Sequence, residues 1–187
     1  MNRILAAAVE VLGVCAASNL RCCVIGGLAV QRWGEPRLTR DVDVTVLCEF
    51  GDEERVTDLL LARLGARRDD ARAFAVRARV VLARASNGVP VDAALGAVPF
   101  EQRAVARATD HPYPGGAVLR TCSAEDLAVM KAFAGRPQDW VDLTGIAMRQ
   151  GPLLDRVQIR AELAPLLALK ETPEDLDRLE AILDEHA

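Results

Sequence analysis

The sequence predicts an α+β fold, a core of helices and strands followed by a helical C-terminal region, from three observations. In the first two thirds of the chain, segments with helical spacing of apolar residues alternate with short strand-like apolar runs. Asn87-Gly88 separates two such runs and is the strongest hairpin signal present. Beyond residue 122 the remaining patterns are mainly helical. We therefore expect a core domain over 1–122 and a helical region over 123–187.

The elements follow from apolar spacing and from turn residues. We expect helices at 2–18, 53–64, 70–78, 100–108, 124–134, around 140–147, at 155–169 and at 174–185, with a short helix just after the glycine pair 26–27. Strands are expected at 22–25, 41–47, 80–84, 89–93 and 117–121, with a turn-rich connector at 111–116. Gly65 is placed to end the helix before it, and Thr172 to cap the last helix. Pro90 lacks an amide donor, so it should lie near the start of its strand or on an edge.

Composition narrows the class of protein. The 187 residues suffice for one well-filled core with a small appendage, and a formal charge of −4 argues against a protein that coats nucleic acid. Glu10 interrupts the apolar N-terminal segment, which therefore fits an amphipathic helix better than a secretory signal. No apolar stretch approaches the ~20 residues that cross a bilayer. We expect a cytoplasmic protein that binds no membrane, with its five cysteines reduced and buried.

The segment 41–47 carries acids at strand spacing. Asp41, Asp43 and Thr45 alternate with three valines, so the valines face the core and the two acids point together into a cleft. Carboxylates placed in this way can share divalent ions that bridge to phosphate, and two-metal sites usually take a third acid from another element. Asp92, on the second arm of the hairpin, is the candidate. The expected metal is Mg²⁺ or Mn²⁺.

The Gly26-Gly27 pair lies between a strand and a short helix. A phosphate that approaches the start of a helix needs exposed backbone amides and no side chain in the way. A Gly-Gly pair alone is a weak signal, but one followed by a strand reading Asp-Val-Asp is considerably stronger. A nucleotide is therefore the first ligand to expect.

These residues resemble a known family. Gly26-Gly27, a helix and then Asp41-Val42-Asp43 match the nucleotidyltransferase pattern of the DNA polymerase β superfamily. The local sequence IGGLAVQRWGEPRLTRDVDV looks most like the minimal bacterial nucleotidyltransferases related to the AbiEii-like toxins of abortive-infection toxin–antitoxin systems. The resemblance covers roughly residues 20–145 and implies a nucleotidyltransferase fold with a small mixed β-sheet flanked by helices.

The resemblance also implies roles. Asp41 and Asp43 would hold the metal ions and Asp92 would help to activate the attacking hydroxyl, while Gly26 and Gly27 would contact the NTP. In the helical region, the segment MKAFAGRPQDWVD carries Lys131, Asp139 and Asp142, which are similar in type and order to residues of the family, and Lys131 and Asp139 are the candidates for the nucleotide site. Lys131 would pair with triphosphate charge. The acceptor stays open between tRNA, a protein and a small molecule, and a cognate antitoxin is an expected partner.

Plainer interpretations stay open for each candidate. Asp41 and Asp43 could lie on an exposed strand face or pair with nearby arginines, and Arg40 could guide a triphosphate or merely neutralise the acids. Asp92 could be a surface acid of a hairpin. Lys131 and Asp139 could occupy ordinary helix-surface positions. The competing function is a non-catalytic module that binds an NTP or a protein partner.

Overall fold

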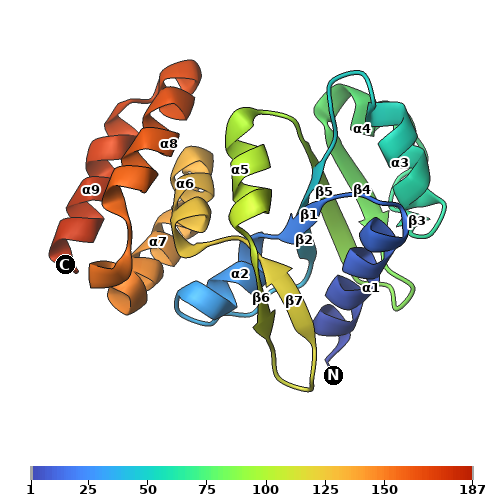
Figure 1. The fold of residues 1–187 in the computed structure, drawn as a ribbon, viewed down its shortest axis with the longest axis horizontal. Coiled ribbons are helices and arrows are strands. Elements are labelled where there is room, and N and C mark those ends of the chain that lie inside the picture. Colours follow the sequence, from blue (N-terminus) through green and yellow to red (C-terminus); the bar gives the residue numbers. More distant parts are fainter. Residues whose placement is uncertain (1, 187) are drawn as a thin grey trace. The chain divides into compact units, whose positions relative to one another are not determined.

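A computed structural model of the chain describes residues 2–186. The described residues form two compact units, one made of residues 2–28 and 38–122 and the other of residues 29–37 and 123–186. Each is treated separately below, and Figure 1 labels the elements of both.

The first unit is built on a seven-stranded mixed sheet, in the order β3-β4-β5-β2-β1-β7-β6. The expected mixed sheet flanked by helices is confirmed. Its strands are β1 (Cys22–Val24), β2 (Val42–Leu47), β3 (Gly65–Ala66), β4 (Val80–Arg84), β5 (Pro90–Gly96), β6 (Thr109–Pro112) and β7 (Val118–Thr121). Its helices are α1 (Arg3–Ala17), α3 (Glu53–Leu61), α4 (Ala71–Ala78) and α5 (Pro99–Arg107), and α2 (Gly26–Trp33) begins in this unit.

The two faces of the sheet differ in chemistry. The three valines of β2 are fully buried in a hydrophobic core with apolar side chains of α1, α3 and α4, as the alternation predicted. Asp43 and Thr45 point to the opposite face, where α5 packs on the far half of β2. A Cβ at Gly96 of β5 would lie 2.9 Å from Thr45 and 3.1 Å from Glu101 of α5, so glycine lets that helix approach. The half of this face close to the start of β2 carries Asp43 and, on the neighbouring strand β5, Asp92.

The hairpin around Asn87-Gly88 is confirmed. β4 and β5 pair antiparallel, from Val80 opposite Ala94 to Arg84 opposite Pro90. Pro90 is the first residue of its strand, where its missing amide costs least.

Three local predictions are wrong. Gly65 does not end α3, which stops at Leu61; instead Gly65–Ala66 pairs with β4 as an edge strand. Thr172 does not cap α9, whose N-cap position is Pro173 without a side-chain cap. The short helix begins at Gly26 itself rather than after the glycines.

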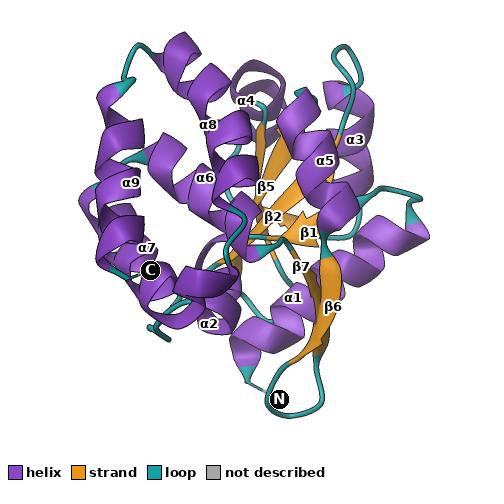
Figure 2. Cartoon of the chain, turned by 60° about the vertical axis from the view of Figure 1, so that its left-hand side comes forward, coloured by secondary structure: helices purple, strands orange, loops and turns teal. Residues whose placement is uncertain are grey.

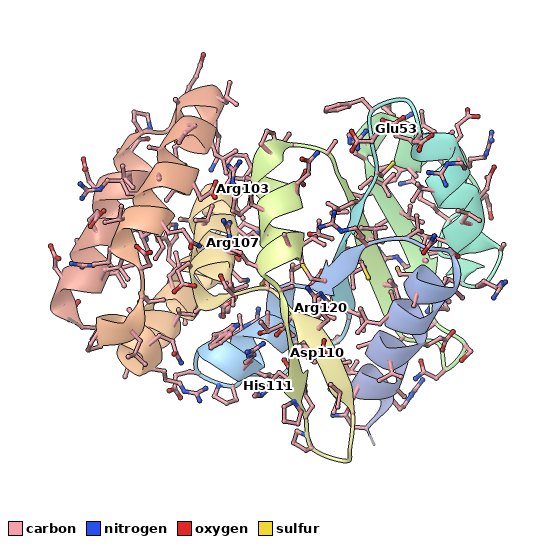
Figure 3. The ribbon with its side chains drawn as sticks, in the orientation of Figure 1. Glu53, Arg103, Arg107, Asp110, His111 and Arg120 are labelled. Carbon is pink, nitrogen blue, oxygen red and sulfur yellow. The ribbon has the colours of Figure 1, made fainter. Side chains whose placement is uncertain are left out.

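The predicted connector 111–116 is also wrong in part, because Thr109–Pro112 forms β6. This strand pairs antiparallel with β7, with Asp110 opposite Arg120 and His111 opposite Leu119. Figure 3 labels Asp110, His111 and Arg120 on this pair of strands. A polar, largely exposed segment that ends in proline carries no strand periodicity, so only its partner strand makes it one.

The second unit is helical, as expected. It contains α6 (Ala124–Ala134), α7 (Pro137–Gln150), a 3-10 turn (Gly151–Leu153), α8 (Arg156–Lys170) and α9 (Glu174–Glu185). Figure 2 draws these helices in purple. Ser123 caps α6 by accepting a hydrogen bond from the Asp126 amide. Within residues 2–186, no helix combines the length and the apolar character that a membrane span requires.

Candidate active site

Gly26 and Asp43 are in direct contact at the start of α2. Gly26 has φ +59°, and a Cβ there would lie 2.0 Å from Asp43 Oδ2 and 2.7 Å from Asp43 Cβ. The Ile25 amide donates to the Asp43 carbonyl at 2.9 Å and fixes the two segments side by side. The absence of a side chain at residue 26 therefore lets the Asp43 side chain pack directly against the backbone at the start of α2.

Asp43 and Asp92 are brought together by strand pairing. β2 and β5 run parallel, and Asp43 is the direct register partner of Asp92. Neighbouring strands lie about 4.8 Å apart, and laterally paired residues project to the same face. The two acids, 49 positions apart in the chain, thus stand next to each other on the face opposite the valine core.

Asp41 lies one residue before β2, and Thr39 holds it. The Thr39 hydroxyl donates to Asp41 Oδ1 at 3.0 Å, and Thr39 is buried. Thr39 also fills the space beside Gly27, where a Cβ would lie 2.5 Å from the Thr39 hydroxyl oxygen. Thr39 could not be predicted as a site residue from the sequence, because a threonine in a polar loop carries no distinct signal.

Asp92 has a cationic neighbour that the sequence did not reveal. Arg67 Nη2 lies 2.6 Å from Asp92 Oδ1. The contact is an ion pair without the alignment of a hydrogen bond, and Asp92 Oδ1 is buried without a hydrogen-bond donor. Arg40, by contrast, is exposed.

The three carboxylates fit a divalent metal in chemistry. Oxygen donors suit Mg²⁺ and Mn²⁺, and the buried Asp92 Oδ1 has no hydrogen-bond donor within residues 2–186. Among residues 2–186, no three Asp, Glu, His or Cys side chains already form a metal-ligand cluster. The side chains of Asp41, Asp43 and Asp92 would therefore have to adjust to hold an ion together.

Lys131, Asp139 and Asp142 form a buried charge network in the second unit. Lys131 Nζ lies 2.8 Å from Asp139 Oδ1 and 2.7 Å from Asp142 Oδ2. Arg37 makes a two-pronged contact with Asp142 at 2.7 and 2.9 Å, and Arg136 does the same with Asp139 at 2.6 and 3.1 Å. The ordinary helix-surface alternative for Lys131 and Asp139 is therefore wrong. The predicted contact of Lys131 with a triphosphate stays a prediction.

The network sets the charge state of its acids. Burial raises the pKa of Asp139, but hydrogen bonds from Arg136 and Lys131 outweigh it and hold the pKa below its usual range. Burial likewise raises the pKa of Asp142, while hydrogen bonds from Arg37 and Lys131 bring it below the usual range. Both acids are ionised at neutral pH.

Comparison with known proteins decides the family. The profile of the family described as "Nucleotidyl transferase AbiEii toxin, Type IV TA system" matches residues 13–186. The chain belongs to this family. Its members are nucleotidyltransferases, so the AbiEii-family resemblance predicted from Gly26-Gly27 and the aspartate strand is confirmed.

Solved structures share the fold of this AbiEii-family chain. An antigenic nucleotidyltransferase-like protein from Paracoccidioides brasiliensis is similar, with a TM-score of 0.52 and 19% identity over 97% of this chain and 92% of the other. The antibiotic-resistance factor ANT(2'')-Ia gives 0.52 and 17% over 91% and 94%. No curated protein sequence matches the chain. At these identities the similarity shows the nucleotidyltransferase fold.

Proposed function

We propose that the chain is a Mg²⁺- or Mn²⁺-dependent enzyme that transfers a nucleoside monophosphate from an NTP to a hydroxyl or phosphate acceptor, with release of pyrophosphate. Family membership supports nucleotidyl transfer in general. The observation that carries the finer proposal is the pairing of Asp43 with Asp92 beside the bare backbone of Gly26.

Each residue has a task in this scheme. The amides of Gly26 and Gly27 at the start of α2 would receive phosphate oxygens, because a helix N-terminus presents unpaired N–H groups and a partial positive charge. Asp41, Asp43 and Asp92 would hold the metal, which when bound neutralises charge on the phosphate and lowers the pKa of the acceptor. Asp92 would accept the proton of the attacking hydroxyl. Thr39 keeps Asp41 in position through its hydrogen bond.

The acceptor and the biological partner form the open part of the proposal. A tRNA end, a protein side chain and a small molecule all offer a suitable hydroxyl. The family is described as the toxin of a type IV toxin–antitoxin system, which supports a toxin role with a cognate antitoxin. Arg40, exposed and close in sequence to Asp41, is the proposed guide for the anionic donor.

A labelling experiment tests the proposal. The purified chain is incubated with each NTP labelled at the α-phosphate, Mg²⁺ and cell extract separated into RNA, protein and small-molecule fractions. We expect label in one fraction, lost with Asp43→Asn and retained with Asp58→Asn, an exposed acid on α3. Measurable NTP binding without transfer to any fraction would instead favour the non-catalytic binding module.

A further inference from the structure

Arg67 lies in one row with Asp92 and Asp43, on the same face of the sheet. Its amide donates to the Leu82 carbonyl at 3.0 Å, which extends the pairing of β3 with β4 by one residue. Leu82 is opposite Asp92 on β5, and Asp92 is opposite Asp43 on β2. Arg67, Leu82, Asp92 and Asp43 therefore occupy four consecutive positions across the sheet.

The geometry requires a long side chain at residue 67. Two strand spacings, about 10 Å, separate the backbone of Arg67 from that of Asp92. The guanidinium crosses Leu82 and places Nη2 2.6 Å from Asp92 Oδ1. Arg67 is only 25% exposed in its side chain, and Asp92 is 36% exposed. Arg67 thus approaches the acid row from the edge strand and offers a fixed positive charge to the third acid.

The contact between Arg67 and Asp92 is an ion pair that another cation can displace. Nη2 is close to Asp92 Oδ1 but is not aligned as a hydrogen-bond donor, so the ion pair is electrostatic without directional bonding. A metal ion binds a carboxylate oxygen at about 2.1 Å and carries twice the charge. A divalent ion at the acids can therefore outcompete the guanidinium for the same oxygen.

We propose that Arg67 is the resident counter-cation of Asp92: it stabilises Asp92 beside Asp43 before metal binds, and it yields Asp92 Oδ1 to the divalent ion while its charge stays close by. This inference rests on the proposed metal-dependent function and adds a residue that sets the affinity for the metal. Arg67 is a positioning residue, because it acts on the reaction through Asp92.

The proposal predicts the direction and size of a change in metal affinity. The Arg67 charge lies within about 4.7 Å of an ion bound to Asp92 Oδ1, the sum of the 2.6 Å ion-pair distance and a metal–oxygen bond of about 2.1 Å. At this distance, with the dielectric constant of water and moderate salt, repulsion weakens divalent binding by about five- to tenfold. Removal of the charge should therefore tighten metal binding by that factor.

The test measures Mn²⁺ binding to the full chain by electron paramagnetic resonance without nucleotide. Arg67→Gln should bind Mn²⁺ about five- to tenfold more tightly than the wild type, and Arg67→Lys, which keeps the charge, should stay near it. Arg68→Gln is the matched control, because Arg68 is the next residue and pairs with Asp70 on the surface. The control should leave the affinity unchanged.

Thermal unfolding supplies a second readout. In chelator, Arg67→Gln should melt below the wild type because Asp92 then loses its counter-cation beside Asp43, and Mn²⁺ should abolish the difference. Arg68→Gln should show no Mn²⁺-dependent recovery beyond that of the wild type.

Different outcomes overturn different statements. Unchanged or weaker Mn²⁺ binding by Arg67→Gln, together with loss of binding in Asp43→Asn, would refute the role of Arg67 and leave the metal site standing. Equal Mn²⁺ binding by the wild type and Asp43→Asn, or no binding by any variant, would remove the proposed metal site and the inference with it.

Discussion

The contact between Gly26 and Asp43 makes a sharp prediction for Gly26→Ala. The new Cβ would lie 2.0 Å from Asp43 Oδ2 and 2.7 Å from Asp43 Cβ. Rotation of the carboxylate can relieve the first contact, but the second involves an atom fixed by the backbone of β2. One of the two segments must therefore shift by several tenths of an ångström or more.

The cost follows from two terms. The left-handed φ of +59° costs an alanine about 1–2 kcal/mol, and a forced shift in a packed site adds roughly 1–3 kcal/mol. We expect a loss of about 2–5 kcal/mol in the free energy of unfolding, measured with urea. Because misplacement by about 1 Å can cost a hundredfold in rate, label transfer should fall about 100-fold.

Gly116→Ala is a control that separates the effect of backbone strain from the effect of a side-chain contact with Asp43. Gly116 also has a positive φ, +83°, but a Cβ there would meet nothing within 4 Å. This variant should lose stability and keep the wild-type rate of transfer. A wild-type rate in Gly26→Ala would refute the view that bare backbone beside Asp43 is required.

Three further predictions concern two residues that hold acids in place and the pKa values of two buried acids. Thr39→Val removes the hydrogen bond to Asp41 at the cost of about 1 kcal/mol in urea unfolding, and should slow transfer while Thr39→Ser retains it; equal rates for the two variants would contradict the orienting role. Lys131→Met leaves two buried carboxylates short of a cation and should cost about 3 kcal/mol in the same assay, near the lower end for a broken buried pair because two arginines remain. Since the pKa values of Asp139 and Asp142 lie below the unfolded value of about 3.9, the stability they confer is complete above that pH and is lost as the pH falls further; acid unfolding followed by circular dichroism should show the loss, and a profile flat below pH 4 would speak against it.

Local sequence patterns were sufficient for the part of the site that lies within one segment. The valine alternation of β2 set the direction of Asp43, and the Gly26-Gly27 pair marked the turn beside it, because both signals depend on residues a few positions apart. The hairpin signal at Asn87-Gly88 placed Asp92 on a strand for the same reason. The roles of these residues in catalysis stay predictions.

Contacts between residues far apart in the sequence could not be predicted from local patterns. Nothing in the periodicity of β2 or β5 specifies that they run parallel with Asp43 opposite Asp92. Arg67 reaches Asp92 only because Gly65–Ala66 forms an edge strand on β4, and two residues are too short to show alternation. The burial of Lys131 among acids likewise depends on how α6 and α7 pack, which the spacing within either helix leaves undetermined.

The most direct test of the central claim is the transfer rate of Asp92→Asn, measured with α-labelled NTP and the acceptor fraction that the wild type labels. If Asp92 completes the acid row with Asp43, the variant should fold, melt near the wild type and lose transfer by at least about a hundredfold. Transfer at the wild-type rate by folded Asp92→Asn would contradict the claim.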